Sequence, residues 1–122
     1  GVTLVEFFHS KCSHCNQQAQ PLNNLHVDYR DNLSGFFSIG GFKFGSNQDN
    51  MQSINDFRNS HGSGWPHLYD TSGGLMSKHD FRNYPSFMLV KDGYVVWDHS
   101  GQLSEKELAA VLEQHGVHSK FG

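Results

Sequence analysis

The sequence contains little cysteine, little proline and no long apolar run. Only two of the 122 residues are cysteine and three are proline. Two cysteines are too few for a disulfide scaffold, and a zinc ribbon needs two cysteine pairs. The apolar runs extend over a few residues, far short of the ~20 that a membrane span requires. The sequence thus predicts no disulfide-stabilised scaffold, no zinc ribbon and no membrane-spanning helix.

Charge is also scarce. Charged residues make up 17% of the chain, and the formal net charge is −3. No basic stripe is present, so we expect no nucleic-acid partner. The ten phenylalanines supply material for a hydrophobic core. A chain of this length can fold around one hydrophobic core without a stabilising disulfide or metal ion. We expect a single domain over residues 1–122 and a monomer.

The start of the chain has the composition of a strand. Gly1 is not methionine, and residues 2–5 are already apolar and β-branched. We expect a chain that was trimmed at its N-terminus, so that any targeting segment or anchor would lie outside this sequence.

Periodicity predicts alternating strands and helices in the first half. We expect strands at 2–8 and 35–44, and helices at 12–33 and 47–61, the first of them kinked or broken at Pro21. The buried stripe of the second helix would be Met51, Ile54 and Phe57. The other core and surface assignments concern phenylalanines and histidines. We place Phe36, Phe37, Phe42 and Phe44 in the core, and His26, His61, His67, His79, His99, His115 and His118 on the surface or in loops.

The second half predicts a hairpin and a final helix. Residues 65–83 are mixed, with a turn at 70–74, and Asp92-Gly93 then joins two apolar strands at 87–90 and 94–97. Ser104 to Glu107 has the pattern of a capping box, and the helix after it ends at Gly116. This order predicts an α/β fold with a mainly parallel sheet, helices on both faces and one antiparallel edge hairpin strand.

Cys12-Ser13-His14-Cys15 lies where the first strand passes into the first helix. The free N–H groups and partial positive charge of a helix N-terminus stabilise a thiolate. We expect Cys12 at the exposed tip and Cys15 one turn deeper, with the two sulfurs within bonding reach. His14 can add positive charge beside the thiolate. This placement favours thiol-disulfide exchange.

Two other interpretations of the cysteine pair stay open. The cysteines could be buried and inert, or they could bind a metal together with His9 and His14, although such short spacings would strain a tetrahedral site. In the second case the same fold would handle copper or dock a protein without catalysis.

Two segments resemble the thioredoxin superfamily. Residues 5–15, Val-Glu-Phe-Phe-His-Ser-Lys-Cys-Ser-His-Cys, are similar to its active-site strand, turn and helix. Residues 84–93, Tyr-Pro-Ser-Phe-Met-Leu-Val-Lys-Asp-Gly, are similar to its proline-led strand and hairpin. Residues 57–74 resemble the insert of the TlpA/ResA-like branch. The resemblance covers essentially the whole chain and implies a thioredoxin-like fold.

The resemblance implies a role for several residues. Cys12 would be the attacking cysteine and Cys15 the resolving one, while Glu6 would be a buried acid that accepts the proton of the resolving thiol. The bond before Pro85 would be cis, and Tyr84 would offer backbone groups to an extended substrate.

Three residues depart from the family pattern. Lys11 stands where many members have Trp. Pro21 lies one residue later than the helix proline of most members, and Tyr84 is bulky where a smaller residue is common. Tyr84 should therefore narrow the substrate groove. His14 occupies a position at which more oxidising members also carry His, and we expect it to lie at the substrate site and to influence the redox potential.

The resemblance also implies an activity. It is protein thiol-disulfide exchange through a mixed disulfide, with no cofactor and no metal, because the cysteine pair carries the electrons. The partner would be a protein with a disulfide or a dithiol. Bacterial members of this branch are usually extracytoplasmic, which implies a periplasmic or other extracytoplasmic location.

Overall fold

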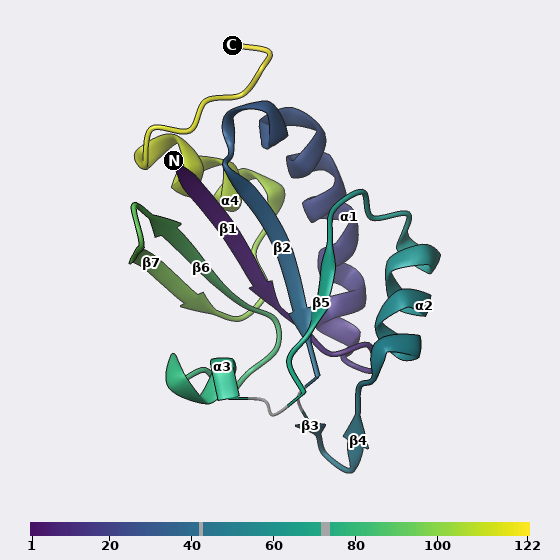
Figure 1. The fold of residues 1–122 in the computed structure, drawn as a ribbon. Helices are drawn as coiled ribbons and strands as arrows, with labels where there is room; N and C mark the ends of the chain where they lie inside the picture. Colours follow the sequence, from purple (N-terminus) through teal and green to yellow (C-terminus); the bar gives the residue numbers. More distant parts are fainter. Residues whose placement is uncertain (42, 72–73) are drawn as a thin grey trace.

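A computed structural model of the chain describes residues 1–41, 43–71 and 74–122. Figure 1 shows a central sheet with α1 and α4 behind it and α3 in front. In chain order the elements are β1 (Val2–Phe7), α1 (Ser13–Tyr29), the 3₁₀ helix η1 (Arg30–Asn32), β2 (Gly35–Gly40), β3 (Lys43–Phe44), β4 (Asn47–Gln48), α2 (Met51–His61), β5 (His67–Tyr69), α3 (Gly74–Lys78), β6 (Ser86–Lys91), β7 (Tyr94–Ser100) and α4 (Glu105–Gln114). Within these described ranges no helix has both the length and the apolar character that crossing a membrane requires.

The main sheet has the strand order β5-β2-β1-β6-β7. β1 is parallel to β2, β2 is parallel to β5, and β6 is antiparallel to both of its neighbours. The predicted α/β class with a mainly parallel sheet is confirmed. The strand that runs against the others is β6 rather than the edge strand β7. Its first residue, Ser86, pairs with Phe7 at the end of β1. β6 therefore starts where β1 ends, and it runs in the direction opposite to β1.

Alternation along β1 divides the core between the two faces of the sheet. One cluster joins the sheet to α1 and α4, and the other joins it to α3 and the segment after α3. The first includes Val2, Leu4, Leu22, Leu25, Phe87, Leu108 and Leu112. The second includes Val5, Phe7, Ile39, Met76, Phe81 and Met88.

The predicted strand at 35–44 is too long, because β2 ends at Gly40. Gly41 has a φ of +112°, and a Cβ there would lie 2.2 Å from the carbonyl oxygen of Asp70. Only glycine fits this close approach, and the chain then leaves the sheet for the β3–β4 hairpin. Phe42 lies outside the described residues. Phe44 is 41% exposed on the hairpin and does not join the core.

α2 begins later than the predicted 47–61, because residues 47 and 48 form β4. Asn50 caps the helix: its side chain accepts from the Ser53 amide, and the Ser53 hydroxyl accepts from the Asn50 amide. Ile54 and Phe57 are buried as predicted, but Met51 is 44% exposed because it occupies the first turn, away from the sheet.

Three further differences lie in α1 and in the segment after α2. α1 continues through Pro21 and passes into η1 after Tyr29, so the proline does not end the helix. The mixed segment 65–83 contains β5 and α3, while residues 72 and 73 of its predicted turn lie outside the described ranges. His67 is buried rather than exposed because it starts β5 against Trp65, with 5.5 Å between ring centroids. Burial lowers the pKa of His67 to about 4.

The hairpin and the last helix match the sequence prediction. Asp92 and Gly93 have φ values of 52° and 85° between β6 and β7, as a tight hairpin turn with two left-handed residues requires. Ser104 and Glu107 form the capping box of α4.

Buried Gln18 fastens α1 to the segment that leads into α4. Its side-chain amide donates to the Leu103 carbonyl at 2.8 Å, and its side-chain oxygen accepts from the Leu103 amide at 2.8 Å. Because Gln18 is fully buried, these two contacts satisfy backbone groups that water cannot reach.

We expect Gln18→Leu to destabilise the fold by about 2–6 kcal/mol, since it leaves two buried backbone groups unsatisfied at about 1–3 kcal/mol each. Urea unfolding measures this loss. As a control, Gln20→Leu changes an exposed residue two positions along the same helix and should cost under about 0.5 kcal/mol. Equal stability of the two variants would contradict the prediction.

Candidate active site

Cys12 is the N-cap of α1. Its Sγ accepts a hydrogen bond from the Cys15 amide at 3.2 Å, in the position that a serine or aspartate oxygen usually takes. Both cysteines are unlinked thiols in this structure. The sulfur of Cys12 therefore lies directly at the positive end of a 17-residue helix, which favours negative charge on it.

The expected exposure of Cys12 is wrong. Only 2% of Cys12 is accessible, and Cys15 is fully buried. Both pack in one cluster with Phe8 and Phe57, and Tyr84 packs against that cluster. Large aromatic side chains from separate segments thus close around the helix N-terminus, which a local motif does not reveal.

The segment 84–85 lies beside the cysteines. The Tyr84–Pro85 peptide bond is cis, and the Tyr84 carbonyl oxygen lies 3.7 Å from the Sγ of Cys12. The Tyr84 hydroxyl donates to the Lys43 carbonyl at 3.0 Å, which ties this segment to the β3–β4 hairpin. The bulky side chain at position 84 therefore spans the space next to Cys12.

Glu6 is buried in β1 and is 2% exposed. Its Oε1 accepts from the Ser38 hydroxyl at 2.7 Å, and that hydroxyl in turn accepts from Nε1 of Trp65 at 2.8 Å. Burial raises the pKa of Glu6 to about 7, and the hydrogen bond from Ser38 opposes this shift only in part.

The thiol of Cys15 has a strongly raised pKa. Burial is the largest cause, followed by the negative charge of Glu6 and a side-chain hydrogen bond with Cys12. A carboxyl group that titrates near neutrality thus lies close to a thiol that resists ionisation.

A buried network on the other side of the cysteine loop was not predicted. Asp49 accepts from the Ser10 amide at 2.9 Å, from the Ser10 hydroxyl, and from the Ser53 hydroxyl at 2.7 Å. His9 is fully buried, with Nδ1 3.7 Å from Asp49 and 3.0 Å from the Lys11 amide that donates to it. No spacing rule links residues 9–11 to residue 49, because the β3–β4 hairpin brings them together.

The metal-binding interpretation needs His9 and His14 beside the cysteines. Among the described residues no three His, Cys, Asp or Glu side chains gather in a way that could hold a metal ion. His9 instead packs between Phe44 and Tyr84, at 5.6 and 5.9 Å between ring centroids. His14 is exposed, with Nδ1 3.2 Å from Oε1 of Gln102.

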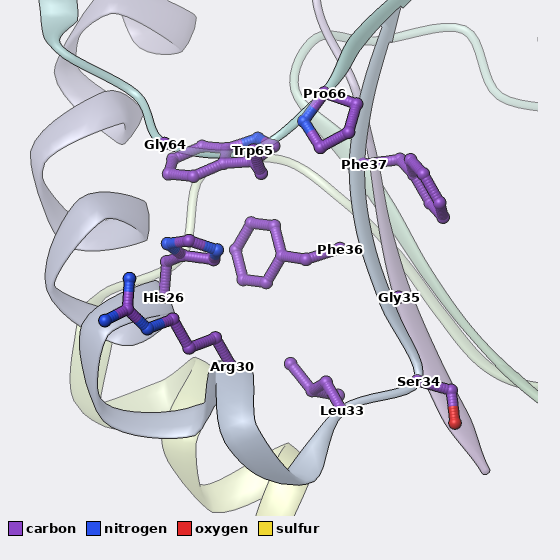
Figure 2. Close-up of a pocket in the computed structure, with 10 residues that line it drawn as sticks. All are labelled: His26, Arg30, Leu33, Ser34, Gly35, Phe36, Phe37, Gly64, Trp65 and Pro66. Atoms are coloured by element: carbon purple, nitrogen blue, oxygen red, sulfur yellow. The ribbon is translucent and has the colours of Figure 1, made fainter.

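Hollows lie near both ends of α1. One, of about 340 Å³, lies beside Cys12 and is lined by Cys12, Ser13, His14, Lys43, Phe44, Gly45, Arg82, Asn83 and Tyr84. The other, of about 270 Å³, lies at the opposite end of α1, where His26, Phe36 and Trp65 face one another (Figure 2). Burial, and then the charge of Arg30, lowers the pKa of His26 in the second hollow. The first hollow reaches Cys12 but is not lined by Cys15.

The raised pKa of Glu6 makes a prediction about stability. The folded protein holds the Glu6 proton up to about pH 7, whereas the usual value is 4.5, so the folded state binds more protons between these limits. The contribution of Glu6 to the free energy of unfolding is therefore fully present below pH 4.5, and it is lost as the pH rises through about 7. We expect Glu6→Gln to remove this loss and to stabilise the reduced protein at pH 8 by about 3 kcal/mol.

Urea unfolding between pH 4 and pH 9 measures the effect of Glu6→Gln. Asp56→Asn, on the exposed side of α2, is the control and should follow the unmodified chain. A pH profile of Glu6→Gln that coincides with the control would show that Glu6 has an ordinary pKa.

No family model matches the chain. A curated relative, the thioredoxin-like protein YneN of Bacillus subtilis (strain 168), is 22% identical over 111 residues, which are 90% of this chain. The match spans only 62% of that relative's length.

Solved structures are similar over most of the chain. The exposed lipoprotein thioredoxin Etrx1 of Streptococcus pneumoniae has a TM-score of 0.74 at 19% identity, covering 93% of this chain and 84% of that one. A secreted disulfide oxidoreductase of Mycobacterium tuberculosis, homologous to DsbE of E. coli, has a TM-score of 0.71 at 18% identity, covering 93% and 81%. The chain therefore has the thioredoxin fold, as its two motifs indicated.

Proposed function

We propose that the chain is a thiol-disulfide oxidoreductase that exchanges electrons with protein disulfides or dithiols through Cys12 and Cys15. The observation that carries this proposal is the N-cap of α1, where the Cys15 amide holds the Sγ of Cys12 at 3.2 Å. The helix N-terminus stabilises the thiolate that must attack, and the buried Cys15 is held one turn below it.

The reaction has two steps, each a thiolate attack on a disulfide. The Cys12 thiolate first attacks one sulfur of the substrate disulfide, which forms a mixed disulfide and releases the other substrate sulfur as a thiolate. The Cys15 thiolate then attacks the Sγ of Cys12 and releases the second substrate sulfur. Two electrons pass to the substrate, the cysteine pair becomes a disulfide, and the reverse sequence oxidises a dithiol.

Glu6 serves the second step as the proton acceptor. Cys15 can attack only after it loses its proton, and its raised pKa makes this unfavourable without a nearby base. Glu6 is the buried carboxyl group whose charge acts on Cys15, and its own pKa of about 7 suits proton transfer at neutral pH. The proton on Glu6 afterwards passes to solvent.

Tyr84, Pro85 and His14 form the substrate side of the site. The Tyr84 carbonyl lies 3.7 Å from the Sγ of Cys12, so an extended segment that pairs with the backbone there brings its sulfur to the attacking atom. His14 lies on the exposed side of the same helix turn, where its positive form would stabilise the thiolate and raise the reduction potential.

We further propose that the chain is one domain, works as a monomer and acts outside the cytoplasm. Two of the structures it resembles are described as an exposed lipoprotein and a secreted oxidoreductase, which supports that location.

The proposed function is tested with a model disulfide peptide and single-cysteine variants. We expect Cys15→Ser to accumulate a mixed disulfide with the peptide, because the resolving thiol is absent. Cys12→Ser should form no adduct, because Cys15 does not line the hollow and burial raises the pKa of its thiol. Mass spectrometry of the acid-quenched reaction gives both results. An adduct with Cys12→Ser and none with Cys15→Ser would reverse the two roles.

The role of Glu6 is tested by separating the two steps in stopped flow. Glu6→Gln should slow release of the mixed disulfide about 10²–10⁴-fold near pH 7 while its formation changes little, since general-base catalysis contributes an amount of this order. The exposed control Asp56→Asn should affect neither step. Unchanged release at every pH would remove Glu6 from the mechanism.

A further inference from the structure

The hollow beside Cys12 carries positive charge and no negative charge of its own. Among the described residues that line it, Lys43 and Arg82 are basic, His14 can become so, and none is acidic. The whole chain has the opposite balance, with twelve acidic residues against nine basic ones. The sign of charge at this hollow is therefore a local feature and does not follow from composition.

The two basic residues come from two segments of the chain that both line the hollow. Lys43 lies in β3, and Arg82 lies in the segment that leads to Pro85. The Arg82 side chain is 85% exposed, and its contact with Asp80 at 3.3 Å is at the surface, where ion pairs contribute little and exchange readily. Arg82 can therefore turn to a carboxylate on a bound molecule.

The β3 residues that line the hollow, Lys43 and Phe44, are held in place by contacts with Tyr84. The Tyr84 hydroxyl donates to the Lys43 carbonyl at 3.0 Å. The ring of Phe44 lies edge-on to Tyr84 at 5.9 Å between centroids, and it remains 41% exposed. The hairpin thus presents a charged residue and a partly exposed aromatic ring side by side, next to the attacking sulfur.

We infer that this hollow selects protein substrates with acidic residues next to the reacting cysteine. The inference rests on the proposed function and adds the substrate class to it. Lys43 and Arg82 bind the carboxylates on the two sides of the cysteine, and Phe44 packs against an apolar side chain of the same segment. Opposite charges across a binding surface raise the association rate and reject substrates of the wrong sign.

The test compares three synthetic disulfide peptides that differ only in the residues flanking the cysteine: aspartate, serine or lysine. The reduced chain should react with the aspartate peptide about fivefold faster than with the serine peptide at low salt, and with the lysine peptide more slowly still. The differences should shrink in about 0.5 M salt, because the charges are exposed and screened. Equal rates for all three peptides at low salt would overturn the inference.

Charge-reversal variants locate the effect. Lys43→Glu with Arg82→Glu should reverse the order of the aspartate and lysine peptides. The matched control, Lys91→Glu with Lys120→Glu, changes the net charge equally at exposed positions that do not line the hollow, and it should keep the original order.

A reversal in both double variants would assign the effect to net charge and overturn the inference. The single variants Lys43→Gln and Arg82→Gln should each lose part of the preference, which keeps the test valid if a double variant does not fold. Failure of the unmodified chain to reduce any of the three peptides would instead overturn the proposed function, and this inference with it.

Discussion

The hydrogen bond from the Cys15 amide to the Sγ of Cys12 is the contact on which the site depends. α1 follows β1 in the chain, and β1 is central in the sheet, between β2 and β6. The same strand carries Glu6, so the sheet fixes the position of the carboxyl group relative to the two thiols. The opposed strand β6 completes this arrangement, because its entry at the end of β1 brings residues 84 and 85 to the cysteines.

Local sequence signals predicted much of this arrangement. Cys12-Ser13-His14-Cys15 after an apolar strand located the helix N-terminus, and Asp92-Gly93 located the final hairpin. The burial of Glu6, which the family resemblance implied, is also confirmed. These signals succeed because a strand, a cap or a tight turn is determined by a few adjacent residues.

The sequence did not predict the features that depend on long-range packing. Gly41 ends β2 because of a carbonyl group that is supplied by Asp70. Cys12 is covered because Tyr84 and the residues of α2 converge on it, and the Asp49 network forms because the β3–β4 hairpin returns to the cysteine loop. Each of these partners lies far along the sequence from the residue it affects, so no local periodicity records it.

The hydrogen-bond chain from Trp65 through Ser38 to Glu6 gives the molecule an optical reporter. Indole emission responds to the polarity and charge around the ring, and Nε1 of Trp65 is two hydrogen bonds from a carboxyl group that titrates near neutrality. Trp97 lies in β7, at the edge of the sheet, and belongs to no part of this chain of contacts. A change of charge on Glu6 would therefore appear in the emission of one of the two tryptophans, without a label and without a substrate.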